Sequence, residues 1–109
     1  MDITVSSRGA NLTASLRATT EKKLAKLTRL ADGIERAEVH YSEEANPRIR
    51  DRERCEITLD GHGRHLRTHA EAGDVLTALE QAVHKVERQL RKSKTKWLRR
   101  HNEGRRHSG

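Results

Sequence analysis

The sequence predicts an α+β domain of order β-α-β-β-β-α, in which two helices pack on one face of a four-stranded sheet. Four short segments alternate apolar and polar residues with the period of two that is typical of strands. Two longer segments repeat apolar residues with the helical period. Every predicted strand has one apolar side and one polar side, so we expect helices to cover the sheet on one side only.

The first predicted strand, residues 2–6, has Ile3 and Val5 on one side, and a turn at "RGAN" follows it. Residues 12–33 then show a helical period, with Thr13 as the expected N-cap and Gly33 as the expected stop. The apolar side of this helix is formed by Leu16, Leu24, Leu27, Leu30 and Ala31. The opposite side is basic and carries Lys22, Lys26 and Arg29.

Three further strands are predicted at residues 34–42, 54–60 and 64–70. A charged loop, "EEANPRIRD", separates the first two, and the tight turn "DGHG" makes the last two a hairpin. The helix between the first and second strands predicts a parallel pair, and the later strands should pair antiparallel. The side chains expected to face the helices are Val39, Tyr41, Cys55, Ile57, Leu59, Leu66, Thr68 and Ala70. The opposite side carries Glu38, His40, Ser42, Arg54, Glu56, Thr58, His65, Arg67 and His69.

Asp74 is the expected cap of a long helix that runs to about Trp97. Its apolar stripe is formed by Val75, Leu76, Leu79, Ala82, Val83, Val86, Leu90 and Trp97. A second stripe is entirely basic and consists of Lys85, Arg88, Lys92, Lys96, Arg99 and Arg100. Residues 85–109 hold ten bases and two acids, so the whole net charge of +7 comes from the last quarter of the chain.

The basic stripe predicts binding to nucleic acid phosphates. An ordinary solvated helix face mixes charges, because like charges four residues apart repel each other. A membrane-surface helix is the weaker alternative, because the sheet already needs the apolar side of this helix. The predicted open side of the sheet has no aromatic residue on which single-stranded bases could stack, which favours contacts to the shape and backbone of structured RNA.

The sequence predicts no catalytic site, no metal and no cofactor. His65 and His69 are four residues apart in a strand, about 13 Å, which is too far for one zinc ion. Cys55 alternates with core residues, so we expect it to be buried and unreactive. The acids of the charged loop could imitate a nuclease cluster, but local ion pairing is the preferred interpretation; they are Glu43, Glu44, Asp51 and Glu53. A single cysteine and the absence of a signal peptide or transmembrane segment predict a cytoplasmic protein.

Two segments resemble the bacterial ribosome hibernation-promoting factors, also called ribosome-associated inhibitor A or sigma-54 modulation proteins. They are "ITVSSRGANLTASLRATTEKKLAKL" and the more specific "DVLTALEQAVHKVERQLRKSKTK". The resemblance covers roughly residues 2–97, which we expect to form the ribosome-binding domain, and residues 98–109 are expected to be a basic, disordered tail. It implies a fold related to double-stranded RNA-binding domains.

The resemblance also implies a function: binding to small-subunit rRNA in the tRNA and mRNA channel at the decoding region, which inhibits translation and preserves idle ribosomes. The residues that match the family pattern are Lys22, Lys23, Lys26, Lys85, Arg88, Arg91, Lys92, Lys94 and Lys96. Together with Arg29, Arg99 and Arg100 they are the predicted rRNA-binding set. No membrane or small-molecule partner is expected, and the free protein should be a monomer.

Two departures from the family pattern are present. Leu76 stands where an aromatic residue is common, and no dimerising domain of the long family members precedes Gly109, so we expect a short form or a piece of a long form. The alternative function is a general double-stranded RNA-binding module. Such a module should carry bases at the start of its last helix, where "DVLTALEQAV" has none.

Overall fold

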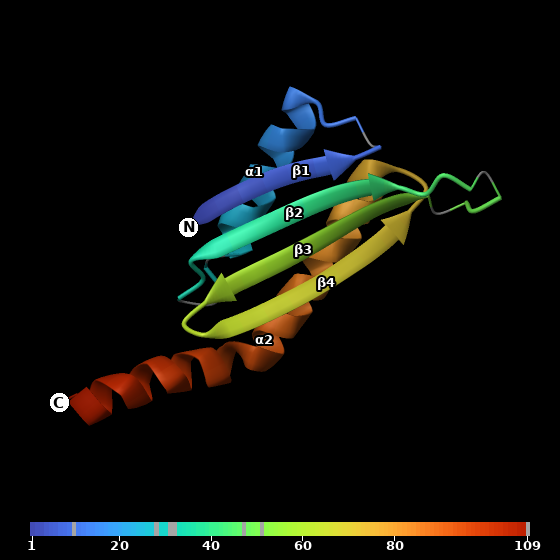
Figure 1. Ribbon diagram of the computed structural model, residues 1–109. Helices are drawn as coiled ribbons and strands as arrows, with labels where there is room; N and C mark the ends of the chain where they lie inside the picture. The colour runs from blue at the N-terminus through green and yellow to red at the C-terminus, as the bar shows by residue number, and fades with distance from the viewer. Residues whose placement is uncertain (10, 28, 31–32, 47, 51, 109) are drawn as a thin grey trace.

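A computed structural model describes the backbone of residues 1–108 except residues 10, 28, 31–32, 47 and 51, and it describes side chains as far as residue 92. The elements are β1 (Asp2–Arg8), α1 (Ala14–Leu27), β2 (Arg36–Glu43), β3 (Glu53–Gly61), β4 (Arg64–Ala72) and α2 (Val75–Ser108). Figure 1 shows both helices behind one four-stranded sheet. The predicted α+β class and the order β-α-β-β-β-α are confirmed.

The strands lie in the order β1-β2-β3-β4. The β1–β2 pair is parallel and the other two pairs are antiparallel, as the connections predict. Because β1 and β4 both run toward the same end of the sheet, α1 and α2 both return along it in the same direction (Figure 1). The bases of the two helices are therefore carried on one layer of the molecule.

The core lies between the sheet and the two helices. Tyr41, Cys55, Ile57 and Leu59 are almost completely buried, as their alternation predicts. Inside the core, the hydroxyl of Thr20 donates to the carbonyl of Leu16 at 2.7 Å and is bonded to the hydroxyl of Tyr41. Burial raises the pKa of the Cys55 thiol to about 12, so a structural role for this cysteine fits its position.

Helix α1 begins where the sequence predicts but ends earlier. The amide of Leu16 donates to the side-chain oxygen of Thr13 at 3.0 Å, which confirms Thr13 as the N-cap. The predicted extent to Gly33 is wrong, because the helix ends at Leu27. The amide of Leu30 then donates to the carbonyl of Leu27 at 3.0 Å, which is the tighter three-residue spacing with which helices often finish. Gly33 has a positive φ of 93°, but it lies in the connection to β2. Ala31 is outside the described residues.

Helix α2 is capped by Asp74, whose carboxylate accepts the amide of Thr77 at 2.8 Å. The predicted end near Trp97 is wrong, because the helical backbone continues to Ser108. The side chain of Trp97 and the predicted tail at residues 98–109 lie outside the part of the chain whose side chains are described, so the separate tail stays a prediction.

In the first turns of α2, the residues that are buried differ from those of the predicted apolar stripe. Leu76 was assigned to the apolar stripe, but half of its surface is exposed, whereas Ala78 is fully buried. Ala78 lies two turns before Lys85 on the same side of the helix. The helix is therefore rotated so that small alanines, Ala78 and Ala82, pack on the sheet and Leu76 is turned out.

Candidate nucleic-acid interface

Three exposed basic residues of α2 form a row along one side of the helix. Lys85, Arg88 and Lys92 are spaced by three and four residues, so their side chains project from neighbouring turns. Together with Gln89 they line a shallow surface hollow. These bases have no acidic ion-pair partner among the residues whose side chains are described. The row is therefore an uncompensated cationic surface.

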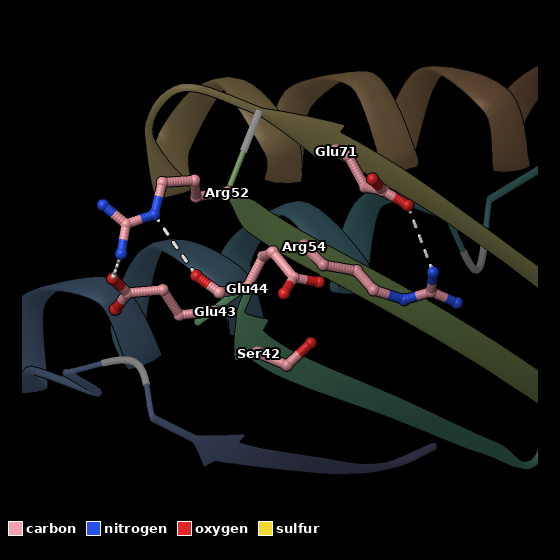
Figure 2. Close-up of a pocket in the computed structure, with 6 residues that line it drawn as sticks. All are labelled: Ser42, Glu43, Glu44, Arg52, Arg54 and Glu71. Atoms are coloured by element: carbon pink, nitrogen blue, oxygen red, sulfur yellow. Dashed lines mark hydrogen bonds and ion pairs between the residues drawn. The ribbon is translucent and has the colours of Figure 1, made fainter. Parts of the chain in front are cut away.

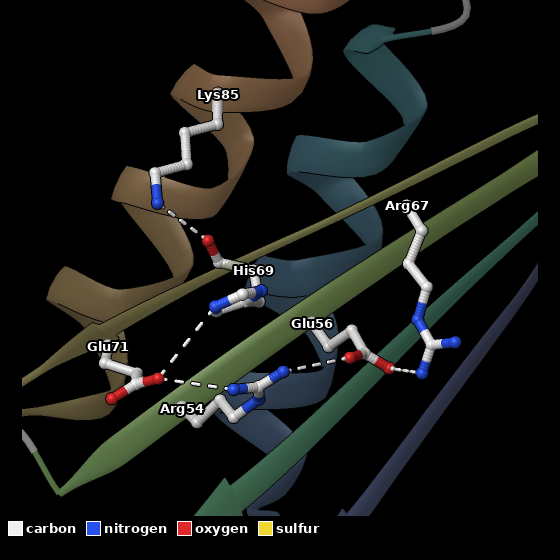
Figure 3. A network of polar contacts seen from close by, with 6 residues as sticks. All are labelled: Arg54, Glu56, Arg67, His69, Glu71 and Lys85. Atoms are coloured by element: carbon white, nitrogen blue, oxygen red, sulfur yellow. Dashed lines mark hydrogen bonds and ion pairs between the residues drawn. The ribbon is translucent and has the colours of Figure 1, made fainter.

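One contact fixes where this row lies on the molecule. The ammonium of Lys85 donates to the backbone carbonyl of His69 at 2.8 Å (Figure 3). His69 belongs to β4, an edge strand of the sheet. The row of Lys85, Arg88 and Lys92 therefore runs beside the free edge of β4, on the side of α2 that is turned away from α1. No local pattern in the sequence predicts a bond between residues so far apart in the chain.

The basic residues of α1 form a separate group. Lys22, Lys26 and Arg29 are exposed, and Lys23 is half-buried. They lie on the other helix of the layer, so the structure does not join them to the α2 row in one stripe. Arg91 is exposed as well, but at 100° per residue it projects from a different side of α2 than Lys85.

The remaining predicted residues lie after residue 92, where the described side chains end. Lys94, Lys96, Arg99 and Arg100 lie on the helical backbone of α2, but their side chains are outside the described residues. Figure 1 shows that this part of α2 extends beyond the end of the sheet. Their roles in binding rRNA stay predictions.

On the open face of the sheet, unlike in the α2 row, the arginines are paired with acids. Arg54 contacts Glu56 and Glu71, both at 3.2 Å, and Arg67 contacts Glu56 at 2.7 Å (Figure 3). The hydrogen bond from Arg67, assisted by Arg54, lowers the pKa of the Glu56 carboxyl. Because bases on this face already have acidic partners, it is a poor surface for phosphates.

One acid at the base of the β2–β3 loop, Glu43, is also paired locally. Arg52 contacts Glu43 at 3.4 Å at the base of the loop, where a hollow is lined by Ser42, Glu43, Glu44, Arg52, Arg54 and Glu71 (Figure 2). Burial, followed by the nearby charge of Glu43, raises the pKa of Glu53. The local ion pairing supports the preferred interpretation of this cluster, and Asp51 lies outside the described residues.

The described part of the chain shows neither of two further classes of site. It contains no group of three histidine, cysteine or acidic side chains arranged to hold a metal ion. None of its helices combines the length and the apolar character that crossing a membrane requires.

Comparison with known proteins gives the family of the chain. A family model described as sigma 54 modulation protein / S30EA ribosomal protein matches residues 3–97. The chain belongs to this family. The match includes the α2 row, and membership agrees with the prediction that the chain is not an enzyme.

One curated relative extends this result. The ribosome hibernation promotion factor of Deinococcus radiodurans is 33% identical over 101 residues, which cover 93% of this chain but 53% of that protein. The chain thus spans about half the length of this curated relative.

Solved structures share the fold. The crystal structure of the Thermus thermophilus Protein Y N-terminal domain matches with a TM-score of 0.72 and 32% identity, over 84% of this chain and 98% of that one. A ribosomal subunit interface protein from Coxiella burnetii matches with a TM-score of 0.73 and 23% identity, over 87% and 99%, which shows likeness of fold alone.

Proposed function

We propose that this chain is a ribosome hibernation factor that binds small-subunit rRNA in the tRNA and mRNA channel at the decoding region. Binding would inhibit translation and preserve idle ribosomes under stress or in stationary phase. The observation that carries the proposal is the exposed row of Lys85, Arg88 and Lys92, which has no acidic partner among the described side chains, in a member of this family. The curated relative named as a ribosome hibernation promotion factor supports it.

The physical basis is the relief of charge repulsion by phosphate. Arg88 and Lys92 are four residues apart on one side of a helix, a spacing at which like charges destabilise the helix by a few tenths of a kcal/mol, about 0.2–0.5. RNA phosphates along the row would remove this repulsion and release condensed counterions. Affinity gained in this way falls steeply with salt concentration.

The second support is the character of the other large surface. The open face of the sheet carries compensated ion pairs and no aromatic residue, so it lacks the platform on which single-stranded bases stack. The helix layer then remains as the surface for RNA. We propose that it contacts the backbone of folded rRNA, and that the free protein is a cytoplasmic monomer whose action needs binding alone, with no cofactor or small-molecule substrate.

Titration of the protein into a cell-free translation system tests the proposal. Inhibition should saturate at about one protein per ribosome, and the protein should sediment with purified small subunits. Inhibition at far lower ratios, or cleavage of rRNA, would instead indicate an enzyme. Competition with an excess of generic double-stranded RNA should leave ribosome binding intact. Complete displacement would support the alternative of a general double-stranded RNA-binding module.

A further inference from the structure

The loop between β2 and β3 projects beyond the sheet, at the end opposite to the one where α2 extends (Figure 1). Its conformation is held by bonds within the loop. The amide of Glu44 donates to the carbonyl of Arg52 at 2.7 Å, and the amide of Arg48 donates to the side-chain oxygen of Asn46 at 3.0 Å. The amide of Ile49 donates to the carbonyl of Asn46 at 3.2 Å. These bonds join the described residues 44 and 52, and residue 46 with residues 48 and 49.

The arginines at the base of this loop are committed to holding it. The guanidinium of Arg52 donates to the carbonyl of Glu44 at 3.2 Å and contacts the carboxylate of Glu43 at 3.4 Å (Figure 2). Arg54 is bound in the same way by Glu71, at 3.2 Å. These contacts neutralise the positive charges of Arg52 and Arg54 at the foot of the loop, so neither arginine is an uncompensated charge.

The tip has a different composition. Arg48 and Arg50 are exposed, and neither has an acidic partner among the described residues. The carboxylate of Glu44, four residues before Arg48, accepts the amide of Asn46 at 3.1 Å. Between the two arginines, Ile49 is 39% exposed. A lone exposed isoleucine indicates nothing by itself. The two arginines, which have no acidic partner among the described residues, are the feature that points to a ligand.

The tip is well separated from the basic row of α2. Helix α2 begins at Val75, at the loop end of the sheet, and runs away from the loop (Figure 1). At a rise of about 1.5 Å per residue, Arg88 lies roughly 20 Å along the helix from Val75. RNA that lies along the row from Lys85 to Lys92 therefore does not pass over the tip.

We propose that the tip formed by Arg48, Ile49 and Arg50 is a second RNA-binding element, which contacts a segment of rRNA separate from the one bound by α2. The two guanidinium groups bind phosphates, for which their planar fork of donors is well suited. Ile49 packs against a sugar or a base edge between them. A single isoleucine offers too little apolar surface to anchor the loop in a membrane. This inference rests on the proposed function and deepens it, because it adds a second rRNA contact to that of the α2 row.

Three double variants, each of which removes two positive charges, test the inference on purified small ribosomal subunits. Arg48→Gln with Arg50→Gln changes the tip, and Arg88→Gln with Lys92→Gln changes the α2 row. Arg8→Gln with Arg36→Gln is the matched control, at exposed positions on strands outside the helix layer and the tip. All replaced side chains are exposed, so circular dichroism and urea unfolding should report an intact fold for each variant.

The tip variant should bind about tenfold or more weakly, and the slope of log affinity against log salt should fall by about two units, since each phosphate contact contributes close to one. The control should match the wild type. If the tip variant behaves like the control while the α2 variant loses affinity, the inference is wrong and the proposed function stands. If all three variants keep wild-type affinity, the proposed rRNA binding fails with it.

A photoreactive amino acid in place of Ile49 gives a direct readout of the contact. It should crosslink to rRNA, at nucleotides different from those reached by the same group in place of Gln89 on α2. Crosslinks from position 49 to ribosomal proteins alone would overturn the assignment to RNA, and crosslinks from both positions to the same nucleotides would overturn the claim of two segments.

Discussion

The ammonium of Lys85 is hydrogen-bonded to the backbone carbonyl of His69 at 2.8 Å, which ties the middle of α2 to the edge strand β4. An ammonium group has three donors, so this bond leaves Lys85 able to contact a phosphate as well. Burial of Ala78, Leu79, Ala82, Val86 and Leu90 sets the rotation of the helix about its own axis, and the bond adds a tie at the sheet edge. This rotation places Arg88 and Lys92 in solvent, on the side of the helix that lies beside the sheet edge.

Replacement of Lys85 by methionine should weaken the attachment of α2 to β4. Lys85→Met keeps most of the aliphatic chain but loses the donor, and because the contact is exposed we expect a loss below about 1 kcal/mol in the free energy of unfolding. Lys22→Met, at an exposed position without a described hydrogen bond, is the control and should be neutral. Urea unfolding measures both, and equal values for the two variants would contradict a stabilising role for the bond.

The charge of the α2 row should determine affinity for small ribosomal subunits. Arg88→Gln with Lys92→Gln should lower affinity by about tenfold or more and reduce the salt slope by about two units. Gln89→Ala changes an uncharged member of the same hollow and should leave the slope unchanged. Filter binding at several salt concentrations gives both quantities. An unchanged slope in the double variant would mean that the row is only a solvated helix face.

The close approach of Gly61 to Gly33 should make Gly61 irreplaceable. A Cβ at Gly61 would collide with the backbone carbonyl oxygen of Gly33 and lie 2.9 Å from the amide nitrogen of Glu35, which donates to the carbonyl of Asp60 at 2.8 Å. Gly61→Ala should therefore cost more than about 2 kcal/mol in unfolding free energy.

Gly73→Ala is the control for this prediction, because a Cβ there meets nothing within 4 Å. It should be neutral or stabilise by up to about 1 kcal/mol, since alanine restricts the unfolded chain more than glycine does. Thermal unfolding distinguishes the two variants, and a tolerated alanine at position 61 would show that the connection before β2 can move away at little cost.

The buried pair of Thr20 and Tyr41 should respond unequally to the loss of each hydroxyl. The single hydroxyl proton of Thr20 is donated to the carbonyl of Leu16, so the hydroxyl of Tyr41 is the donor to Thr20. Tyr41→Phe should cost about 1 kcal/mol. Thr20→Val should cost more, roughly 1–3 kcal/mol, because it leaves the Tyr41 hydroxyl buried without this acceptor. Addition of Tyr41→Phe to Thr20→Val should recover stability, and a simple sum of the two losses in urea unfolding would argue against the assigned donor.

The cap of α2 should give part of the stability a pH dependence. Hydrogen bonds from the amide and the hydroxyl of Thr77 lower the pKa of Asp74 in the folded protein. The lowered pKa means that the ionised cap stabilises the fold above the unfolded pKa of about 3.9, and this contribution is lost as the pH falls through the folded value.

Asp74→Asn provides the comparison, because asparagine also caps helices but does not titrate. The wild type should be more stable than this variant at pH 6, and the difference should shrink progressively below about pH 4. Chemical unfolding across this range measures the difference. A constant difference down to pH 2 would contradict the role of the ionised carboxylate.

The features that the sequence predicts correctly are those that depend on neighbouring residues. Alternation over a few residues assigns Val39, Cys55 and Ile57 to the core because successive side chains of a strand point to opposite faces. Thr13 and Asp74 are found as caps because their side chains bond amides only three residues away. The basic row of α2 follows from the helical period in the same way, without knowledge of the sheet.

The tertiary structure decided the features that depend on distant parts of the chain. The early end of α1 at Leu27, the exposure of Leu76 and the bond from Lys85 to His69 all result from how each helix lies on the sheet. Periodicity gives the position of a residue around a helix, but the rotation of that helix is set by packing, here by alanines that pack on the sheet and a carbonyl at its edge. For this reason the sequence by itself determined which residues form the cationic row, whereas only the folded protein determined that the row faces away from α1, beside the free edge of β4.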